Sequence, residues 1–116
     1  MAEMTTSRMF EVIESKLKED PKPIEGMETT YRFNLSGDDG GVYELHLNNG
    51  LAEVKAGENG DANCTIEMSD QNFKEMLLGN LNATSAFMTG KLKVKGDLSK
   101  AMKLQSVLGK YDASSF

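Results

Sequence analysis

The chain has 116 residues, of which 39% are hydrophobic and 27% charged, and its formal net charge is −5. These values are typical of one soluble globular domain and argue against a nucleic-acid partner, while no stretch approaches the ~20 apolar residues of a membrane span. A single cysteine, Cys64, excludes an internal disulfide, and the first residues lack a signal-peptide pattern. We therefore expect one domain over residues 1–116 in the cytoplasm.

The first half of the chain predicts a helix followed by an antiparallel meander. Apolar residues repeat at helical spacing over Thr6–Lys18, and Pro21 and Pro23 end that helix. Strict alternation of apolar and polar residues then predicts three short strands, joined by a Gly/Asp turn and by the hairpin signal Asn49-Gly50. These strands are Thr30–Ser36, Val42–Asn48 and Leu51–Ala56.

Candidate catalytic and metal-binding residues are few. His46 is the only histidine, and because it alternates with Leu45 and Leu47 its side chain should face solvent. Cys64 alternates with the polar residues of a fourth strand over residues 62–68, so inert core packing is the favoured interpretation. No second histidine or cysteine can complete a transition-metal site, and no nucleophile motif is present. We therefore expect no metal, no cofactor and no catalytic site.

The second half predicts two helical pieces, a fifth strand and a last helix. Ser69 suits a helix N-cap, a second piece spans about residues 82–88, and a strand covers Lys91–Lys95. Some twenty residues separate strands four and five, enough for a crossover that would make these two strands parallel. The expected class is α+β, a five-stranded mixed sheet with helices on one face.

The last helix, about Leu98–Lys110, is more apolar than a surface helix requires. Gln105 lies inside its apolar surround, either as a helix-edge glutamine bonded to backbone or as a polar group aimed into a ligand cavity. The eight methionines allow two interpretations as well, core filler or an adaptable pocket lining.

Positive charge is concentrated near the last strand and helix. Residues 1–90 hold seven Lys or Arg against sixteen Asp or Glu, whereas residues 91–110 hold six Lys against Asp97 alone. This block is either a solvated outer face or a docking patch for anionic lipid head groups.

The segment from Ser85-Ala86-Phe87 through Gly90-Lys91-Leu92-Lys93-Val94-Lys95-Gly96-Asp97 to Ala101-Met102-Lys103-Leu104-Gln105 resembles the sterol carrier protein 2 family. The resemblance extends more loosely over essentially the whole chain. It implies a five-stranded sheet with helices on one face, enclosing an apolar tunnel for sterols, fatty acids, fatty acyl-CoA or phospholipids. The residues that it places in the tunnel lining are Phe73, Met76, Leu77, Leu81, Phe87, Met88, Leu98, Met102, Gln105 and Leu108.

The leading hypothesis is a non-enzymatic lipid carrier that docks transiently on anionic membranes. The alternative is a protein-interaction or dimerisation module that buries the apolar C-terminal helix against another chain. An acyl-CoA hydrolase using His46 is a distant third. The lysines expected to dock are Lys91, Lys93, Lys95, Lys100 and Lys103.

Overall fold

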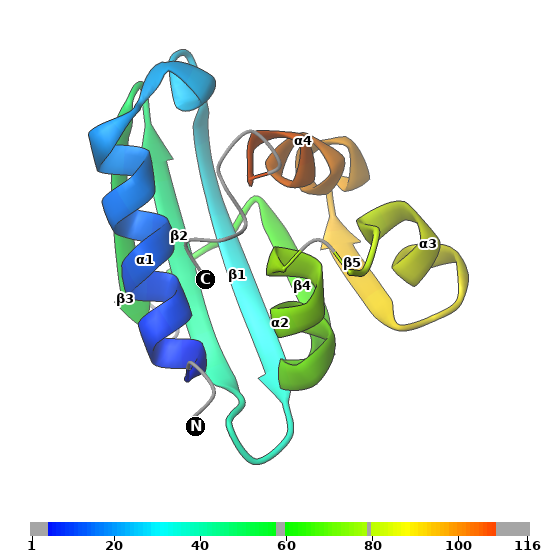
Figure 1. The fold of residues 1–116 in the computed structure, drawn as a ribbon. Helices are drawn as coiled ribbons and strands as arrows, with labels where there is room; N and C mark the ends of the chain where they lie inside the picture. Colours follow the sequence, from blue (N-terminus) through cyan, green and yellow to red (C-terminus); the bar gives the residue numbers. More distant parts are fainter. Residues whose placement is uncertain (1–4, 58–59, 79, 109–116) are drawn as a thin grey trace.

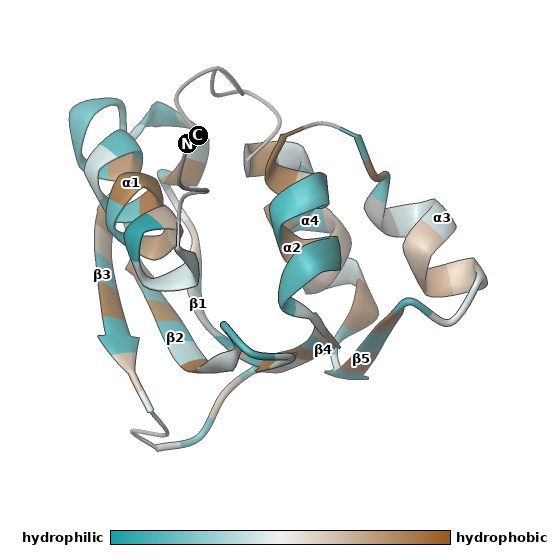
Figure 2. Ribbon diagram, turned by 60° about the horizontal axis from the view of Figure 1, so that its bottom comes forward, coloured by the Kyte–Doolittle hydropathy of each residue, from teal (hydrophilic) through white to brown (hydrophobic). Residues whose placement is uncertain are grey.

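One five-stranded sheet carries the fold, with its strands in the spatial order β3-β2-β1-β4-β5 (Figure 1). The computed structural model describes residues 5–57, 60–78 and 80–108, except the side chains of Ala83 and Leu108. Helices α1, α2 and α4 cover one face of the sheet, and α3 lies beside β5 at its edge (Figure 2). The predicted α+β class with a mixed sheet is confirmed. In chain order the elements are α1 (Thr6–Glu19), the 3-10 helix η1 (Lys22–Ile24), β1 (Glu28–Ser36), β2 (Gly41–Asn48), β3 (Leu51–Ala56), β4 (Cys64–Ser69), α2 (Asp70–Leu77), α3 (Ala83–Met88), β5 (Leu92–Gly96) and α4 (Leu98–Leu108).

Helix starts follow the capping residues. The side chain of Thr5 accepts a hydrogen bond from the backbone N–H of Arg8 and starts α1. Ser69 does the same for α2, where its hydroxyl accepts from the N–H of Asn72 at 3.0 Å, as predicted. Because these side chains satisfy N–H groups that have no partner within the helix, both helices begin within a residue of the predicted position.

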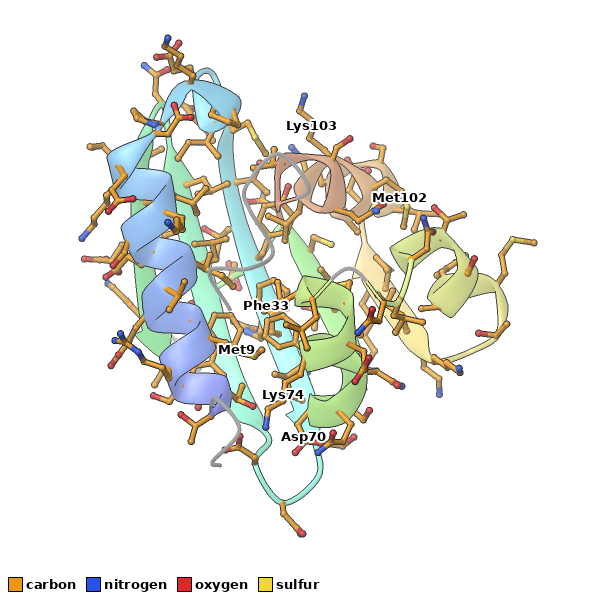
Figure 3. The ribbon with its side chains drawn as sticks, in the orientation of Figure 1. Met9, Phe33, Asp70, Lys74, Met102 and Lys103 are labelled. Atoms are coloured by element: carbon orange, nitrogen blue, oxygen red, sulfur yellow. The ribbon has the colours of Figure 1, made fainter. Side chains whose placement is uncertain are left out.

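The core lies between the helices and the alternating apolar residues of the strands. Tyr31 and Phe33 of β1 are buried, and Phe10 of α1 contacts Phe33 with ring centroids 5.3 Å apart. Phe73 of α2 stacks on Phe10 at 5.0 Å, so one aromatic cluster joins α1, the sheet and α2 (Figure 3). Cys64 is fully buried, as predicted.

Strands β4 and β5 are antiparallel, so the predicted parallel pairing of these two strands is wrong. Leu92, the first residue of β5, pairs with Met68 near the end of β4. A single helix after β4 would return the chain to the beginning of β4, and a parallel β5 would start there. Here α3 follows α2 and brings the chain back to the end of β4, so β5 starts there and runs antiparallel. The parallel pair in the sheet is β1 with β4, where Tyr31 pairs with Cys64.

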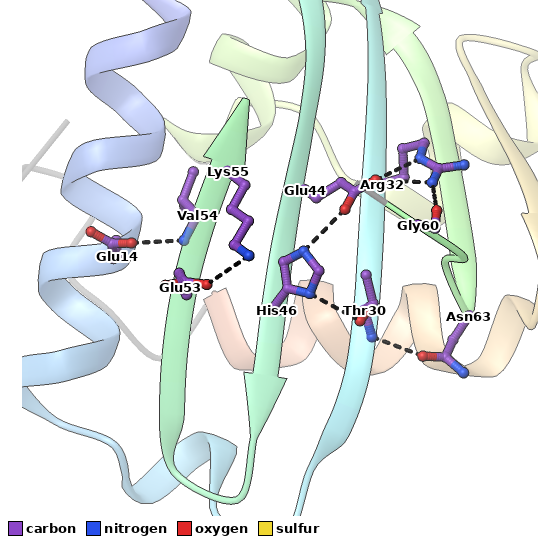
Figure 4. Close-up of polar contacts among 10 residues, drawn as sticks. All are labelled: Glu14, Thr30, Arg32, Glu44, His46, Glu53, Val54, Lys55, Gly60 and Asn63. Atoms are coloured by element: carbon purple, nitrogen blue, oxygen red, sulfur yellow. Dashed lines mark hydrogen bonds and ion pairs between the residues drawn. The ribbon is translucent and has the colours of Figure 1, made fainter. Parts of the chain in front are cut away.

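The sheet face opposite the helices holds a buried ion-pair cluster (Figure 4). The carboxylate of Glu44 is fully buried. It accepts a hydrogen bond from Arg32 Nε at 3.0 Å, and its other oxygen lies 3.0 Å from His46 Nε2. His46 Nδ1 lies 3.3 Å from the hydroxyl of Thr30. His46 therefore points away from the helices, as the alternation predicts, but it is half-buried in this cluster rather than solvated.

Two residues of the connection from β3 to β4, Gly60 and Asn63, contact β1 beside this cluster. Arg32 donates to the carbonyl of Gly60, and Asn63 Oδ1 accepts from the N–H of Thr30 at 2.8 Å. These contacts hold the connection against β1. No helix in the described part of the chain is long and apolar enough to cross a membrane.

Candidate functional site

A small apolar cavity of about 20 Å³ lies under α4, between the sheet and α2. This volume has room for about one water molecule. Seven of its eight lining residues are apolar, and Gln105 is the polar one. The lining residues are Phe33, Ile66, Met76, Leu92, Ala101, Met102, Leu104 and Gln105.

The strands supply the floor of the cavity and the helices supply its cover. Phe33 and Ile66 are cross-strand neighbours in the parallel pair β1–β4, and both side chains point toward the helices. Met76 closes the cavity from α2, while Ala101 of α4 leaves space because its side chain is a single methyl group. The long thioethers of Met76 and Met102 can change rotamer at low cost, so the cavity has an adaptable lining.

The ten predicted tunnel residues fall into distinct environments. Met76, Met102 and Gln105 line the cavity. Phe73 and Leu77 are buried in the core, and Leu81 is half-buried against it. Their role in ligand binding stays a prediction. Three others are exposed, with exposed fractions of 38% for Phe87, 80% for Met88 and 40% for Leu98. The side chain of the tenth residue, Leu108, lies outside the described part of the structure.

Five cavity residues were not among the predicted ones: Phe33, Ile66, Leu92, Ala101 and Leu104. The alternation of the strands did indicate that Phe33, Ile66 and Leu92 face the helices. What it could not indicate is which of the many inward-facing residues lie under α4. That depends on where α4 crosses the sheet.

A buried tyrosine fixes α4 over this cavity. The hydroxyl of Tyr31 donates to the backbone carbonyl of Lys100 at 2.8 Å, and Tyr31 is fully buried. Burial, with the nearby Cys64 thiol and Asp97 carboxylate, raises the pKa of Tyr31 to about 12. The phenol therefore keeps its proton and remains a donor at any physiological pH.

Asp97 caps the beginning of α4. Its Oδ1 accepts from the N–H of Ser99 at 3.0 Å. Hydrogen bonds from Ser99 and from the backbone of Lys100 lower the pKa of Asp97. The tyrosine and the cap together position the first turn of α4.

The five lysines expected to dock do not share one surface. Lys93 and Lys95 lie on the sheet face opposite the helices, where Lys95 pairs with Glu67 at 3.2 Å. Lys103 points away from the sheet on the outer side of α4 (Figure 3). Lys91 is exposed where β5 begins, and Lys100 Nζ lies 3.4 Å from the hydroxyl of Thr29.

The side chains that line the cavity offer non-covalent contacts. Within the described residues, no group of three or more His, Cys, Asp or Glu side chains is placed to hold a metal ion. Burial, and to a smaller extent the charge of Asp97, raises the pKa of the Cys64 thiol, while Lys100 lowers it in part. This cysteine is therefore not an activated nucleophile. An apolar cavity with one amide in its wall is suited to holding an apolar molecule by burial.

The chain resembles proteins of known family in both sequence and fold. The model of the SCP-2 sterol transfer family matches residues 10–109. The chain is 38% identical over 105 residues to hydroxysteroid dehydrogenase-like protein 2 of Xenopus tropicalis, an alignment that covers 90% of this chain and 25% of that protein. The chain thus spans about a quarter of the length of the curated relatives that it matches.

Solved structures agree with this assignment. Sterol carrier protein 2 from Yarrowia lipolytica, in its apo form, is 30% identical with a TM-score of 0.72, and the match covers 93% of each chain. The palmitated SCP2L2 protein of Aedes aegypti has the same fold, with 20% identity, a TM-score of 0.76 and coverage of 90% of this chain and 95% of that one. Because the family model matches residues 10–109, this protein belongs to the SCP-2 sterol transfer family.

Proposed function

We propose that this chain is a non-enzymatic carrier that encloses the apolar part of a lipid between the sheet, α2 and α4. The observation that carries the proposal is the cavity under α4, which is lined by seven apolar residues and one amide. Family membership supports a lipid-binding and transfer role. The fold neighbour described as palmitated is consistent with an acyl chain as one ligand class.

Burial of the apolar part of the lipid supplies the favourable free energy for such a carrier. Sequestering a ten-carbon acyl stretch contributes roughly 8 kcal/mol at ~0.8 kcal/mol per methylene, before the costs of association. Because this gain is non-directional, we propose a broad preference that includes sterols, fatty acids, fatty acyl-CoA and phospholipids. In this proposal the amide of Gln105, which lines the cavity, hydrogen-bonds a carboxylate or hydroxyl at the polar end of the ligand.

The cavity must enlarge to take such a ligand, since pockets for small molecules commonly measure about 300 to 1,000 Å³. Rotation of Met76 and Met102 and separation of α4 from α2 would provide that space. The proposed function includes no bond-breaking step. The relatives named as dehydrogenase-like are longer proteins, and this chain aligns with about a quarter of their length. We therefore propose no oxidoreductase activity for this chain.

The alternative role as a dimerisation module is not favoured. Three apolar residues of α4, namely Ala101, Leu104 and Val107, are already buried within one chain. The helix therefore does not need a second chain to cover them.

Two measurements test the carrier proposal. Native mass spectrometry of mildly purified protein should show co-purified lipid, and the delipidated protein should bind a fluorescent fatty acid saturably. Ala101→Phe should lower that affinity at least about tenfold by filling the cavity, while Leu51→Ala, an exposed position on β3, should leave it unchanged.

A second variant covers the case in which Ala101→Phe does not fold. Gln105→Leu keeps the size of the side chain and should weaken fatty-acid binding several-fold by removing the amide. Absence of co-purified lipid together with absence of saturable binding would show that the carrier proposal is wrong.

A further inference from the structure

The end of α3 exposes two large apolar side chains at the β5 edge of the sheet. α3 lies at the β5 edge of the sheet, on the same side as the other helices and at the far end from α1 (Figure 1, Figure 2). Met88 at its last turn is 80% exposed and Phe87 is 38% exposed. These two adjacent side chains leave a small apolar patch at the end of α3 that the described part of the chain does not cover.

The charge around this tip is positive although the protein is acidic overall. From Met76 to Gly96 the sequence has three lysines and no Asp or Glu. Lys91 is exposed three residues after Met88, and Lys93 is exposed on β5. The acidic group that faces these lysines is Glu67 of β4, which lies opposite Lys93 and pairs with Lys95 at 3.2 Å. The tip therefore keeps a positive charge through Lys91.

α3 is also loosely attached to the rest of the molecule. Among its described side chains, Ala86 is the buried one. One hydrogen bond to α4 runs from the hydroxyl of Thr84 to the sulfur of Met102 at 3.5 Å, and a thioether is a weak acceptor. Met102 lines the cavity under α4, so α3 covers one of the cavity's own wall residues.

We propose that the tip of α3, formed by Phe87, Met88 and Lys91, is the surface that docks on an anionic lipid bilayer. The two apolar side chains enter the interface between head groups and acyl chains, and Lys91 lies among the anionic head groups. Docking draws α3 away from Met102 and opens the cavity on the side that faces the membrane. This proposal rests on the proposed function, because the opening matters only if the cavity takes a lipid.

The absence of tryptophan from the sequence allows a direct test. Phe87→Trp introduces a single fluorophore at the proposed contact, and Leu51→Trp introduces one at the opposite edge of the sheet, where Leu51 is 70% exposed. With vesicles that contain about 30% phosphatidylserine, the fluorescence of the Phe87→Trp protein should shift to the blue and be quenched by brominated acyl chains. The Leu51→Trp protein should show neither change. A response from the Leu51→Trp protein alone would overturn the proposal.

A second pair of variants tests the docking without relying on the fluorophore. Met88→Gln should reduce co-sedimentation with the same vesicles about fivefold or more, and Met88→Leu should retain it, because the apolar contribution is lost in the first and kept in the second. Equal co-sedimentation of both variants with wild type would contradict the proposal. So would a wild-type dimer in solution that Met88→Gln converts to a monomer, because the tip would then be a protein interface.

Failure of this proposal can be separated from failure of the carrier proposal. The wild-type protein is titrated with a fluorescent fatty acid in the absence of vesicles. If it binds the fatty acid but the introduced tryptophan at position 87 does not respond to anionic vesicles, the carrier proposal stands and the docking proposal is wrong.

Discussion

Tyr31 connects the sheet to the first turn of α4 through one buried hydrogen bond. We predict that Tyr31→Phe lowers the free energy of unfolding by about 1 to 2 kcal/mol, since it removes a buried hydrogen bond to the carbonyl of Lys100. Urea unfolding measures this change. Tyr43→Phe is the matched control, because Tyr43 is half-buried on the same face of the sheet and should give a smaller effect. Equal decreases for the two variants would show that the Tyr31 hydrogen bond does not contribute measurably to the free energy of unfolding.

The same tyrosine gives a prediction in alkaline solution. Burial raises the pKa of Tyr31 to about 12 from its ordinary value near 10. A raised pKa in the folded state gives stability that is complete below about pH 10 and is lost as the pH rises toward 12. The difference in unfolding free energy between wild type and Tyr31→Phe should therefore shrink over this interval. A difference that stays constant from pH 8 to pH 12 would contradict the assigned shift.

Side-chain direction was largely predictable from the sequence at the scale of single residues, whereas side-chain neighbours were not. Alternation correctly indicated that Cys64 and Leu92 face the helices. It placed His46 on the opposite face but could not indicate that Glu44 is fully buried beside it. Glu44 pairs with Arg32, which also contacts Gly60 of the connection between β3 and β4, and no local pattern encodes such contacts.

The turn between β1 and β2 holds the first turns of two helices. Asp39 Oδ2 accepts from the N–H of Thr6 at 2.8 Å and from Lys74 Nζ at 2.8 Å. The N–H of Asp39 in turn donates to Asp70 Oδ2 at 3.0 Å. α1 and α2 are therefore positioned relative to the sheet by the same turn, and the spacing of these helices above the core depends on it.

We predict that Asp39→Asn lowers the free energy of unfolding at pH 6, because it removes the ion pair with Lys74. The decrease should be at most about 1 kcal/mol, since the side chain of Asp39 is 40% exposed and solvent screens the pair. Hydrogen bonds from Lys74 and Thr6 lower the pKa of Asp39. Its contribution is thus present above about pH 4, the ordinary pKa, and is lost as the pH falls through the lower folded value. Unfolding measured from pH 6 to pH 2 should show the two proteins converging in acid. Asp38→Asn removes the same charge from the same turn and serves as the control.

The elements themselves were predictable to within one or two residues, but their connection was not. The caps Ser69 and Asp97 and the hairpin Asn49-Gly50 each act over a few residues, so the sequence displays them directly. The direction of β5 depends on whether α2 and α3 reverse the chain once or twice. That is decided by packing of α2 on the sheet and of α3 at its edge, which the helical pattern of residues 70–88 does not contain.

α3 should be the least protected helix against hydrogen exchange. Of its described side chains Ala86 is buried, whereas α2 buries Phe73 and Leu77 and α4 buries Leu104 and Val107. Local opening is easiest where few apolar contacts must be broken. Exchange followed by mass spectrometry in the absence of lipid should therefore show the amides of α3 exchanging before those of α2 and α4. Protection of α3 equal to that of α2 would remove the physical reason for assigning it a movable role.

At the scale of the whole molecule, the candidate site is an interior space that has to be enlarged. About 20 Å³ under α4 cannot hold an acyl chain, so ligand binding must include the free energy of separating packed side chains. The sequence predicted that apolar residues would gather near the last helix. The size of the space between them could not be predicted, because it depends on how closely α4 and α2 approach the sheet.

This cost of enlargement leads to a prediction about chain length. The cost is similar for every fatty acid, whereas the gain from burial grows by ~0.8 kcal/mol per methylene, or about fourfold in Kd. Short acids should therefore fail to bind, and affinity should rise steeply above a threshold length until the chain outgrows the space. Thermal unfolding with saturated acids of increasing length measures this, because a ligand at 100 times its Kd stabilises the folded state by about 2.7 kcal/mol. If the unfolding temperature rose equally with all lengths, the head group rather than the apolar chain would determine binding, and the space under α4 would not be the binding site.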